Sequence, residues 1–151
     1  MKYWLVKSEP DVYSIDDLAR DGRTGWDGVR NYQARNMLRD EMSVGDRVLF
    51  YHSNAKPPGV AGVAVVSRPG HPDPTQFDPK HDHHDPKADP EDPRWYQVEF
   101  EHVATFPALV PLDALRARKG LEKMLLLQRG QRLSVMPVTK REFDLILKMG
   151  G

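Results

Sequence analysis

Apolar and polar residues alternate along residues 95–105 with the two-residue period of a β-strand. Tyr96, Val98 and Phe100 fall on one face of this segment, and the side chains between them are polar. The pattern predicts a strand with one buried and one solvated face. Apolar runs rich in β-branched and aromatic residues predict three more strands, at residues 2–7, 48–52 and 60–66.

Helices are predicted where a capping residue precedes an apolar stripe of helical spacing. The capping patterns are Ser14 with Asp17, Asn31 alone, and Thr139 with Glu142. The expected buried stripes are Ala34, Met37 and Leu38 after the second cap, and Phe143, Ile146 and Leu147 after the third. Further helical segments are expected at 111–118 and 121–128. Because strands and helices are mixed without a regular βαβ alternation, we expect an α+β fold around a small antiparallel barrel.

Residues 69–94 form the most polar stretch of the chain. Seven of the thirteen prolines lie there, and residues 71–94 carry seven acidic against three basic side chains, a net charge of −4. A composition of this kind does not pack a core. We therefore expect a long loop, rich in Pro, Asp and His, inside a single domain that spans residues 1–151.

Composition narrows the class of protein. The chain has no cysteine, which excludes disulfides, zinc–thiolate sites and thiol catalysis. Its formal net charge is zero, so any nucleic-acid surface has to be a local patch rather than a wholly basic face. The first residues do not resemble a signal peptide, and no apolar run approaches the ~20 residues of a membrane helix. We expect a cytoplasmic monomer without a metal or other cofactor.

Residues 26–36 place an indole, a phenol, two guanidinium groups and several amides at the junction of a predicted loop and helix. The face of Trp26 can stack on a flat ring, and Arg30 and Arg35 can hold phosphate in a planar fork. Asn31 can read the edge of a ring because its amide both donates and accepts, although a capping role explains it as well. This chemistry favours a nucleobase as the ligand.

The chain resembles the EVE domain family over nearly its whole length. The resemblance rests on YWLVKSEP at residues 3–10 and WDGVRNYQARN at 26–36, with shorter matches at 44–46, 51–54, 73–78, 93–96, 132–135 and 137–138. It implies a PUA-like antiparallel β pseudobarrel flanked by short helices. It also implies a likeness to YTH domains, which read a methylated base in an aromatic cage.

The same resemblance implies a ligand pocket and its residues. Lys7 and Ser8 would lie at its mouth as hydrogen-bond donors, and Trp26 would form a wall. Tyr32 and Trp95 are candidates for the remaining walls. The other lining residues implied in this way are Arg30, Asn31, Arg35, His52, Ser53, Asn54 and Ser134.

The His-Asp-His-His-Asp tract at residues 81–85 offers several metal ligands. Its spacing matches no fixed metal motif, so a solvated loop explains it more simply. His83 and His84 also stand where the resembling family has aromatic residues, usually tyrosine. If those rings cover the pocket in the family, the two histidines mark a departure in this chain.

These patterns together predict a non-catalytic module that reads modified nucleobases in DNA or RNA. A hydrolase acting on a nucleotide-like molecule is the alternative, with Ser53, His52 and Asp27 as a conceivable triad that lacks a nucleophile-elbow context. A Ser–Lys pair is disfavoured because Lys7 and Ser8 are neighbours on a strand and point to opposite faces. A protein that binds a peptide or metabolite is the third alternative.

Overall fold

A mixed six-stranded sheet organises the chain in the computed structural model, which describes residues 1–130 and 132–151. The strand order is β2-β5-β4-β3-β1-β6. The strands are β1 (Tyr3–Ser8), β2 (Arg23–Gly25), β3 (Arg47–His52), β4 (Gly59–Pro72), β5 (Tyr96–Pro111) and β6 (Val135–Val138). The four strands predicted from apolar patterning are thus all present, and β4 and β5 are longer than expected.

Local capping signals correctly located most of the helices. Ser14 and Thr139 each form a capping box, and the Asn31 side chain accepts a hydrogen bond from the Ala34 amide. The helices are α1 (Ile15–Asp21), α2 (Tyr32–Asn36) with a π-helical continuation (Met37–Glu41), α3 (Leu112–Ala117) and α4 (Lys140–Gly150). Short 3-10 turns occur at Pro74–Phe77 and Leu125–Leu127. The α+β prediction is confirmed.

The strand pairs are antiparallel, as expected, except for one. β1 runs parallel to β3 and antiparallel to β6. A parallel neighbour requires a crossover, and α1, β2 and α2 supply it between β1 and β3. β2 and β6 had no sequence signal of their own, since β2 has three polar or small residues and β6 contains Pro137, which an edge strand tolerates.

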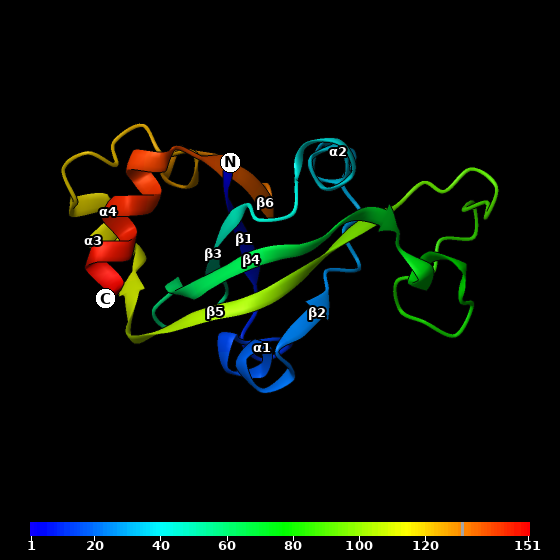
Figure 1. Cartoon of the computed structure of the whole chain (residues 1–151), viewed down its shortest axis with the longest axis horizontal. Helices are drawn as coiled ribbons and strands as arrows, with labels where there is room; N and C mark the ends of the chain where they lie inside the picture. The colour runs from blue at the N-terminus through cyan, green and yellow to red at the C-terminus, as the bar shows by residue number, and fades with distance from the viewer. Residues whose placement is uncertain (131) are drawn as a thin grey trace.

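Both faces of the sheet are covered, which explains the continuous apolar runs of β1 and β3. Trp4 and Phe50 face a core that includes residues of α1 and α2, while Leu5 and Leu49 face a second core with residues of α3 and α4. Figure 1 shows the long β4–β5 pair running along the molecule, with α3 and α4 at one end. Leu147 of α4 was wrongly assigned to the buried stripe and is 41% exposed.

The segment between β4 and β5 projects at the opposite end of the molecule from α4 (Figure 1). Although the segment is polar, two of its residues are fully buried, Asp73 and Gln76. The Gln76 side chain donates to the carbonyls of Asp73 and Trp95 and accepts from the amides of Arg94 and Trp95. Polar residues with all their hydrogen bonds satisfied take the place of an apolar core here. The helices in the described ranges are all too short or too polar to span a bilayer.

Candidate functional site

A cavity of about 590 Å³ opens where β1 ends, and we call it the Trp26 pocket. It brings together the end of β1 and the segment that follows it, β2 and the segment that follows it, one residue of the β4–β5 loop and one residue just before β6. Its lining is Lys7, Ser8, Glu9, Val12, Tyr13, Thr24, Gly25, Trp26, Asp27, Gly28, Val29, Arg30, His83 and Ser134. The volume lies within the range of small-molecule sites in proteins.

Trp26 forms an aromatic wall whose orientation is set by the core behind it. The Trp26 amide donates to Val98 O at 2.7 Å, which fixes the backbone against β5. The indole meets Phe50 edge-on at 5.5 Å, Phe100 at a tilt at 5.3 Å and Tyr13 edge-on at 6.3 Å between ring centroids. Because the ring is only partly buried and also lines the pocket, it is a preorganised face for a flat ligand.

Polar groups at the end of β1 and just before β6 also line the pocket. The Lys7 amide donates to Ser134 O at 2.9 Å, so these two residues are held side by side. The Ser8 hydroxyl donates to Tyr13 O at 2.6 Å, and its oxygen can still accept a hydrogen bond. Burial lowers the pKa of the Lys7 ammonium. The structure therefore brings Lys7, Ser8, Trp26 and Ser134 together at one cavity.

Arg30 lines the same pocket, but its guanidinium is engaged with the protein. It contacts Asp73 Oδ2 at 3.1 Å, Thr75 Oγ1 at 3.3 Å and His83 O at 2.6 Å. Although burial alone raises the pKa of Asp73, hydrogen bonds from Thr75, from the Gly28 amide and from Arg30 outweigh it and hold that pKa below its usual value. The expected phosphate contact of Arg30 is replaced by a structural one, which fastens the β4–β5 loop to the pocket wall.

His83 extends from that loop over the pocket, and Gly28 makes room for its ring. A Cβ atom on Gly28 would lie 2.5 Å from His83 Cε1, and the φ of +77° at Gly28 also favours glycine. His83 Nδ1 lies 3.8 Å from Asp27 Oδ1, too far for a hydrogen bond, and has no hydrogen-bond partner among the described residues. The imidazole thus stands at the pocket edge with an unused polar atom.

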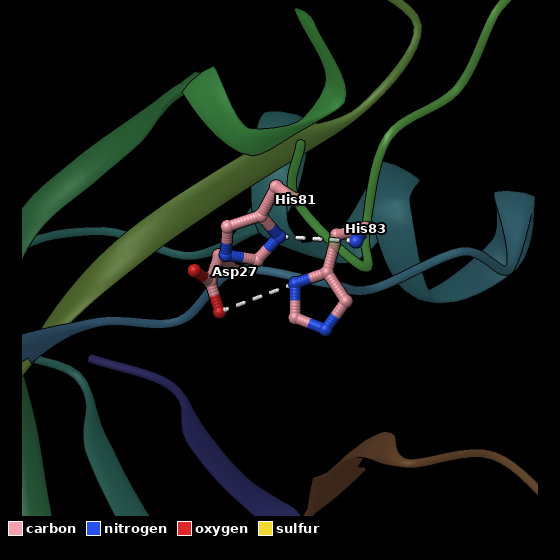
Figure 2. A group of neighbouring side chains, drawn as sticks. All are labelled: Asp27, His81 and His83. Atoms are coloured by element: carbon pink, nitrogen blue, oxygen red, sulfur yellow. Dashed lines mark hydrogen bonds and ion pairs between the residues drawn. The ribbon is translucent and has the colours of Figure 1, made fainter. Parts of the chain in front are cut away.

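Figure 2 shows that His81 lies beside this pair. Asp27, His81 and His83 each present one potential ligand atom within 4.8 Å of the others. However, His81 Nδ1 accepts the His83 amide at 3.0 Å, so neutral His81 carries its proton on Nε2. That nitrogen is then not free to bind a cation, and the geometry favours a hydrogen-bonded loop at the pocket mouth over a metal centre.

His52, Ser53 and Asn54 lie behind the pocket and do not line it. His52 Nε2 accepts the Ile15 amide at 3.1 Å, the Ser53 amide donates to Ser8 O at 3.0 Å, and Asn54 Nδ2 donates to Glu9 Oε1 at 2.7 Å. Burial lowers the pKa of His52, although Asp16 opposes this shift. These residues hold the connection from β1 to α1 in place. Because its Nε2 accepts from the Ile15 amide, His52 does not form the conceivable triad with Ser53 and Asp27.

Tyr32, Arg35 and Trp95 form a separate stack outside the pocket. The Tyr32 and Trp95 rings lie 4.9 Å apart and nearly parallel, and the Arg35 guanidinium lies 4.9 Å from the Tyr32 ring centre. Trp95 is buried and donates to Asp85 Oδ2 at 2.7 Å, and Arg35 donates to Arg94 O at 2.8 Å. Asn31 caps α2. None of these four residues lines the Trp26 pocket.

Sequence reasoning missed most of the lining. Tyr13 just before α1 and Thr24 in β2 carry no motif of their own, and only the tertiary fold brings them to the pocket. Gly28 did carry a signal, since a glycine between Asp27 and Val29 marks a positive φ or a close approach, and both occur. Asp27 and His83 were considered only as a conceivable base and as a cover of the pocket, and the lining residues without any expectation from the sequence are Glu9, Val12, Tyr13, Thr24, Gly25, Gly28 and Val29.

Comparisons with known proteins agree with this architecture. A family model described as the EVE domain matches residues 2–149. Human thymocyte nuclear protein 1 is 39% identical over 165 residues, which cover 97% of this chain and 73% of the relative. A solved protein of Pseudomonas putida is 50% identical, with a TM-score of 0.94 and 99% of each chain covered. The structure of human THYN1 in complex with 5-methylcytosine-containing DNA is 40% identical, with a TM-score of 0.91, and covers 99% of this chain and 98% of that chain.

Proposed function

The chain belongs to the EVE domain family, and on that premise we propose that it binds a modified nucleobase of a nucleic acid in the Trp26 pocket. The observation that carries the proposal is the likeness to human THYN1, whose structure contains 5-methylcytosine DNA and superimposes over 99% of this chain. The pocket adds the physical reason. It combines a fixed aromatic face with hydrogen-bonding groups at its rim.

A base enters such a pocket only if it leaves its stack. Extrusion from a duplex costs a few kcal/mol, and stacking on an aromatic side chain returns about 1–3 kcal/mol per base. A methyl group buried against Trp26 adds about 0.8 kcal/mol. Because the cost of extrusion and the gain from stacking nearly balance, a modest extra contact decides whether the flipped state is populated. This balance favours a modified base over the unmodified one.

The rim supplies groups that read the edge of a base. Ser134, Lys7, Asp27 and Thr24 all line the cavity. A carboxylate accepts from the exocyclic amine of cytosine or adenine, whereas hydroxyl and ammonium groups donate to ring nitrogens and carbonyls. Both kinds of partner are available in one cavity, as recognition of a base edge requires.

The role proposed is binding without catalysis. The Ser8 hydroxyl donates to Tyr13 O, and His52 lies behind the pocket, where its Nε2 accepts from the Ile15 amide. Arg30 is fastened to Asp73 and Thr75. Ser8, His52 and Arg30 are therefore engaged with the protein itself, as expected for groups that hold the shape of a module that reads a base.

The test is a binding comparison between matched oligonucleotides that differ in one base. We expect a strand with a single 5-methylcytosine, or another methylated base, to bind at least several-fold more tightly than its unmodified counterpart. Trp26→Leu keeps an apolar side chain against Phe50 but removes the π-face, and it should abolish this preference. Tyr32→Leu removes an exposed aromatic ring outside the pocket and should leave the preference intact. Equal affinity for every matched pair, or a preference that survives Trp26→Leu, would refute the proposal.

A further inference from the structure

A second cavity of about 530 Å³ lies across β1 from the Trp26 pocket, and we call it the Arg116 cleft. It is lined by Lys7, Tyr51, Leu112, Arg116, Leu126, Leu127, Gln128, Arg129 and Gly130. Lys7 lines both cavities, so the two sites meet at a single residue at the end of β1. The family resemblance and the base pocket do not account for this second site.

The charged groups of the cleft are all cationic. Lys7, Arg116 and Arg129 line it, and no carboxylate does within the part of the chain that the structure describes. Across residues 1–130 and 132–151, neither Arg116 nor Arg129 forms an ion pair. Some of the other arginines in the described ranges form ion pairs with acids, namely Arg20, Arg23, Arg30, Arg39 and Arg94. Two unpaired guanidiniums facing one cavity are therefore available to an anion.

The walls of the cleft strengthen such an interaction. Leu112, Leu126 and Leu127 line it beside the charged groups, and Leu126 is only 8% exposed. Apolar walls lower the local dielectric and so increase the attraction between a guanidinium and an anion. Arg116 also lies close enough to Tyr51 to oppose the rise in pKa that burial causes at its phenol. The charge of Arg116 is therefore felt at the Tyr51 phenol, which also lines the cleft.

Charge is also segregated along the whole molecule. Residues 112–132 carry six basic and two acidic side chains, a net charge of +4, whereas residues 71–94 carry a net charge of −4. In Figure 1 α3 lies at one end of the molecule and the loop between β4 and β5 at the other. A polyanion that enters the Trp26 pocket is therefore attracted toward the α3 side and repelled from the loop.

We propose that the Arg116 cleft binds a backbone phosphate of the same strand whose base occupies the Trp26 pocket. The inference rests on the proposed function and adds the path of the strand. A base and its neighbouring phosphate are joined through one sugar, so their sites have to be contiguous, and the shared Lys7 makes them so. Arginine holds phosphate as a planar fork, and the leucine walls provide an apolar surface for the sugar.

The test measures how binding of a single-stranded oligonucleotide with one 5-methylcytosine depends on salt. Each phosphate contact on a single strand contributes about 0.7 to the slope of log K against log salt, which is about fivefold in affinity between 1 M and 0.1 M. The double variant Arg116→Ala/Arg129→Ala, which we call the cleft variant, should lose about 0.7 from this slope. Arg118→Ala/Lys119→Ala removes the same charge from exposed positions of the same segment that do not line the cleft. This control should keep most of the wild-type slope.

The proposal would be overturned if the cleft variant kept the wild-type slope. It would also be overturned if the control Arg118→Ala/Lys119→Ala lost as much of the slope as the cleft variant. Free 5-methyl-2′-deoxycytidine lacks a phosphate and should bind the wild type and the cleft variant equally. If the nucleoside does not bind to the wild type, the base proposal fails, whatever the slope shows. Inorganic phosphate added at constant ionic strength should weaken binding of the strand to the wild type and should have no such effect on the cleft variant. Phosphate that binds to the cleft without any loss of strand affinity would assign the cleft to free phosphate and overturn the strand assignment.

Discussion

Asp73 Oδ2 lies 3.1 Å from Arg30 Nη1, and this ion pair joins the loop between β4 and β5 to the wall of the Trp26 pocket. The Asp73 side chain is fully buried, and the same oxygen accepts the Gly28 amide at 2.8 Å. Its other oxygen accepts from the amide and hydroxyl of Thr75. One carboxylate therefore organises the backbone of the pocket wall and the first turn of the loop.

Removal of the Asp73 charge should destabilise the protein. In Asp73→Asn the Arg30 guanidinium loses its ionic partner in a mostly buried position, and breaking such a pair costs about 3 kcal/mol. Urea denaturation followed by circular dichroism measures this change in the free energy of unfolding. Asp78→Asn is the matched control, because Asp78 lies in the same loop but is exposed. A loss of less than about 1 kcal/mol in Asp73→Asn would contradict the structural role.

The contribution of Asp73 should also depend on pH in a defined direction. Its pKa in the folded state lies below the ~3.9 of an unfolded aspartate, so its stabilising effect is complete above that value. The effect is lost as the pH falls through the lower pKa of the folded state. The difference in unfolding free energy between wild type and Asp73→Asn should therefore shrink below about pH 4. A difference that is independent of pH would show that the carboxylate charge is not involved.

The lowered pKa of His52 predicts a second loss of stability, at a higher pH than the loss caused by Asp73. Burial holds the pKa of its imidazole below the usual 6.5, so the neutral ring stabilises the fold fully above that value and progressively less as the pH falls through the folded pKa. Protonation at Nε2 removes the acceptor for the Ile15 amide, which costs about 1 kcal/mol. An NMR titration should report a His52 pKa below 6.5. His52→Gln retains an acceptor that does not titrate, and it should flatten the stability profile in this range.

Gly28→Ala should impair the pocket more than its backbone strain alone explains. A positive φ costs an L-residue about 1–2 kcal/mol, and the added Cβ also meets the His83 ring at 2.5 Å. Gly22→Ala is the matched control, because Gly22 has φ of +78° but a Cβ added there would have no atom within 4 Å. We expect both variants to lose similar stability, while only Gly28→Ala weakens binding of a methylated oligonucleotide. Equal binding by the two variants would mean that the position of His83 is unimportant to the ligand.

The features that the sequence predicted well are local ones. The caps at Ser14 and Thr139 were recognisable because both partners of a capping box lie within three residues. Trp26 was recognisable as a pocket residue because a large aromatic ring next to Asp27 and Gly28 is unusual in a core. The parallel pairing of β1 with β3 was not recognisable, since it depends on how the crossover folds back.

The role of Arg30 shows why the remainder of the site was not predictable. Its partner Asp73 lies 43 residues away in a segment whose composition indicates a solvated loop. A pattern of arginines at helical spacing does not distinguish a cation that is free from one that is engaged. Arg116 illustrates the opposite case, because nothing in its local sequence marks it as facing a cleft with Lys7. Long-range contacts decide which charges remain available for a ligand.

The indole N–H signals of the three tryptophans provide the most direct test of the central claim. Trp26 lines the pocket, Trp4 is 1% exposed in the core, and Trp95 is stacked on Tyr32 outside the pocket. In a two-dimensional NMR titration with an oligonucleotide carrying one 5-methylcytosine, the Trp26 signal should shift or broaden, while those of Trp4 and Trp95 stay in place. The unmodified strand should give a smaller change at the same concentration. A Trp26 signal that does not respond, or a change confined to Trp95, would show that the base does not bind in this pocket.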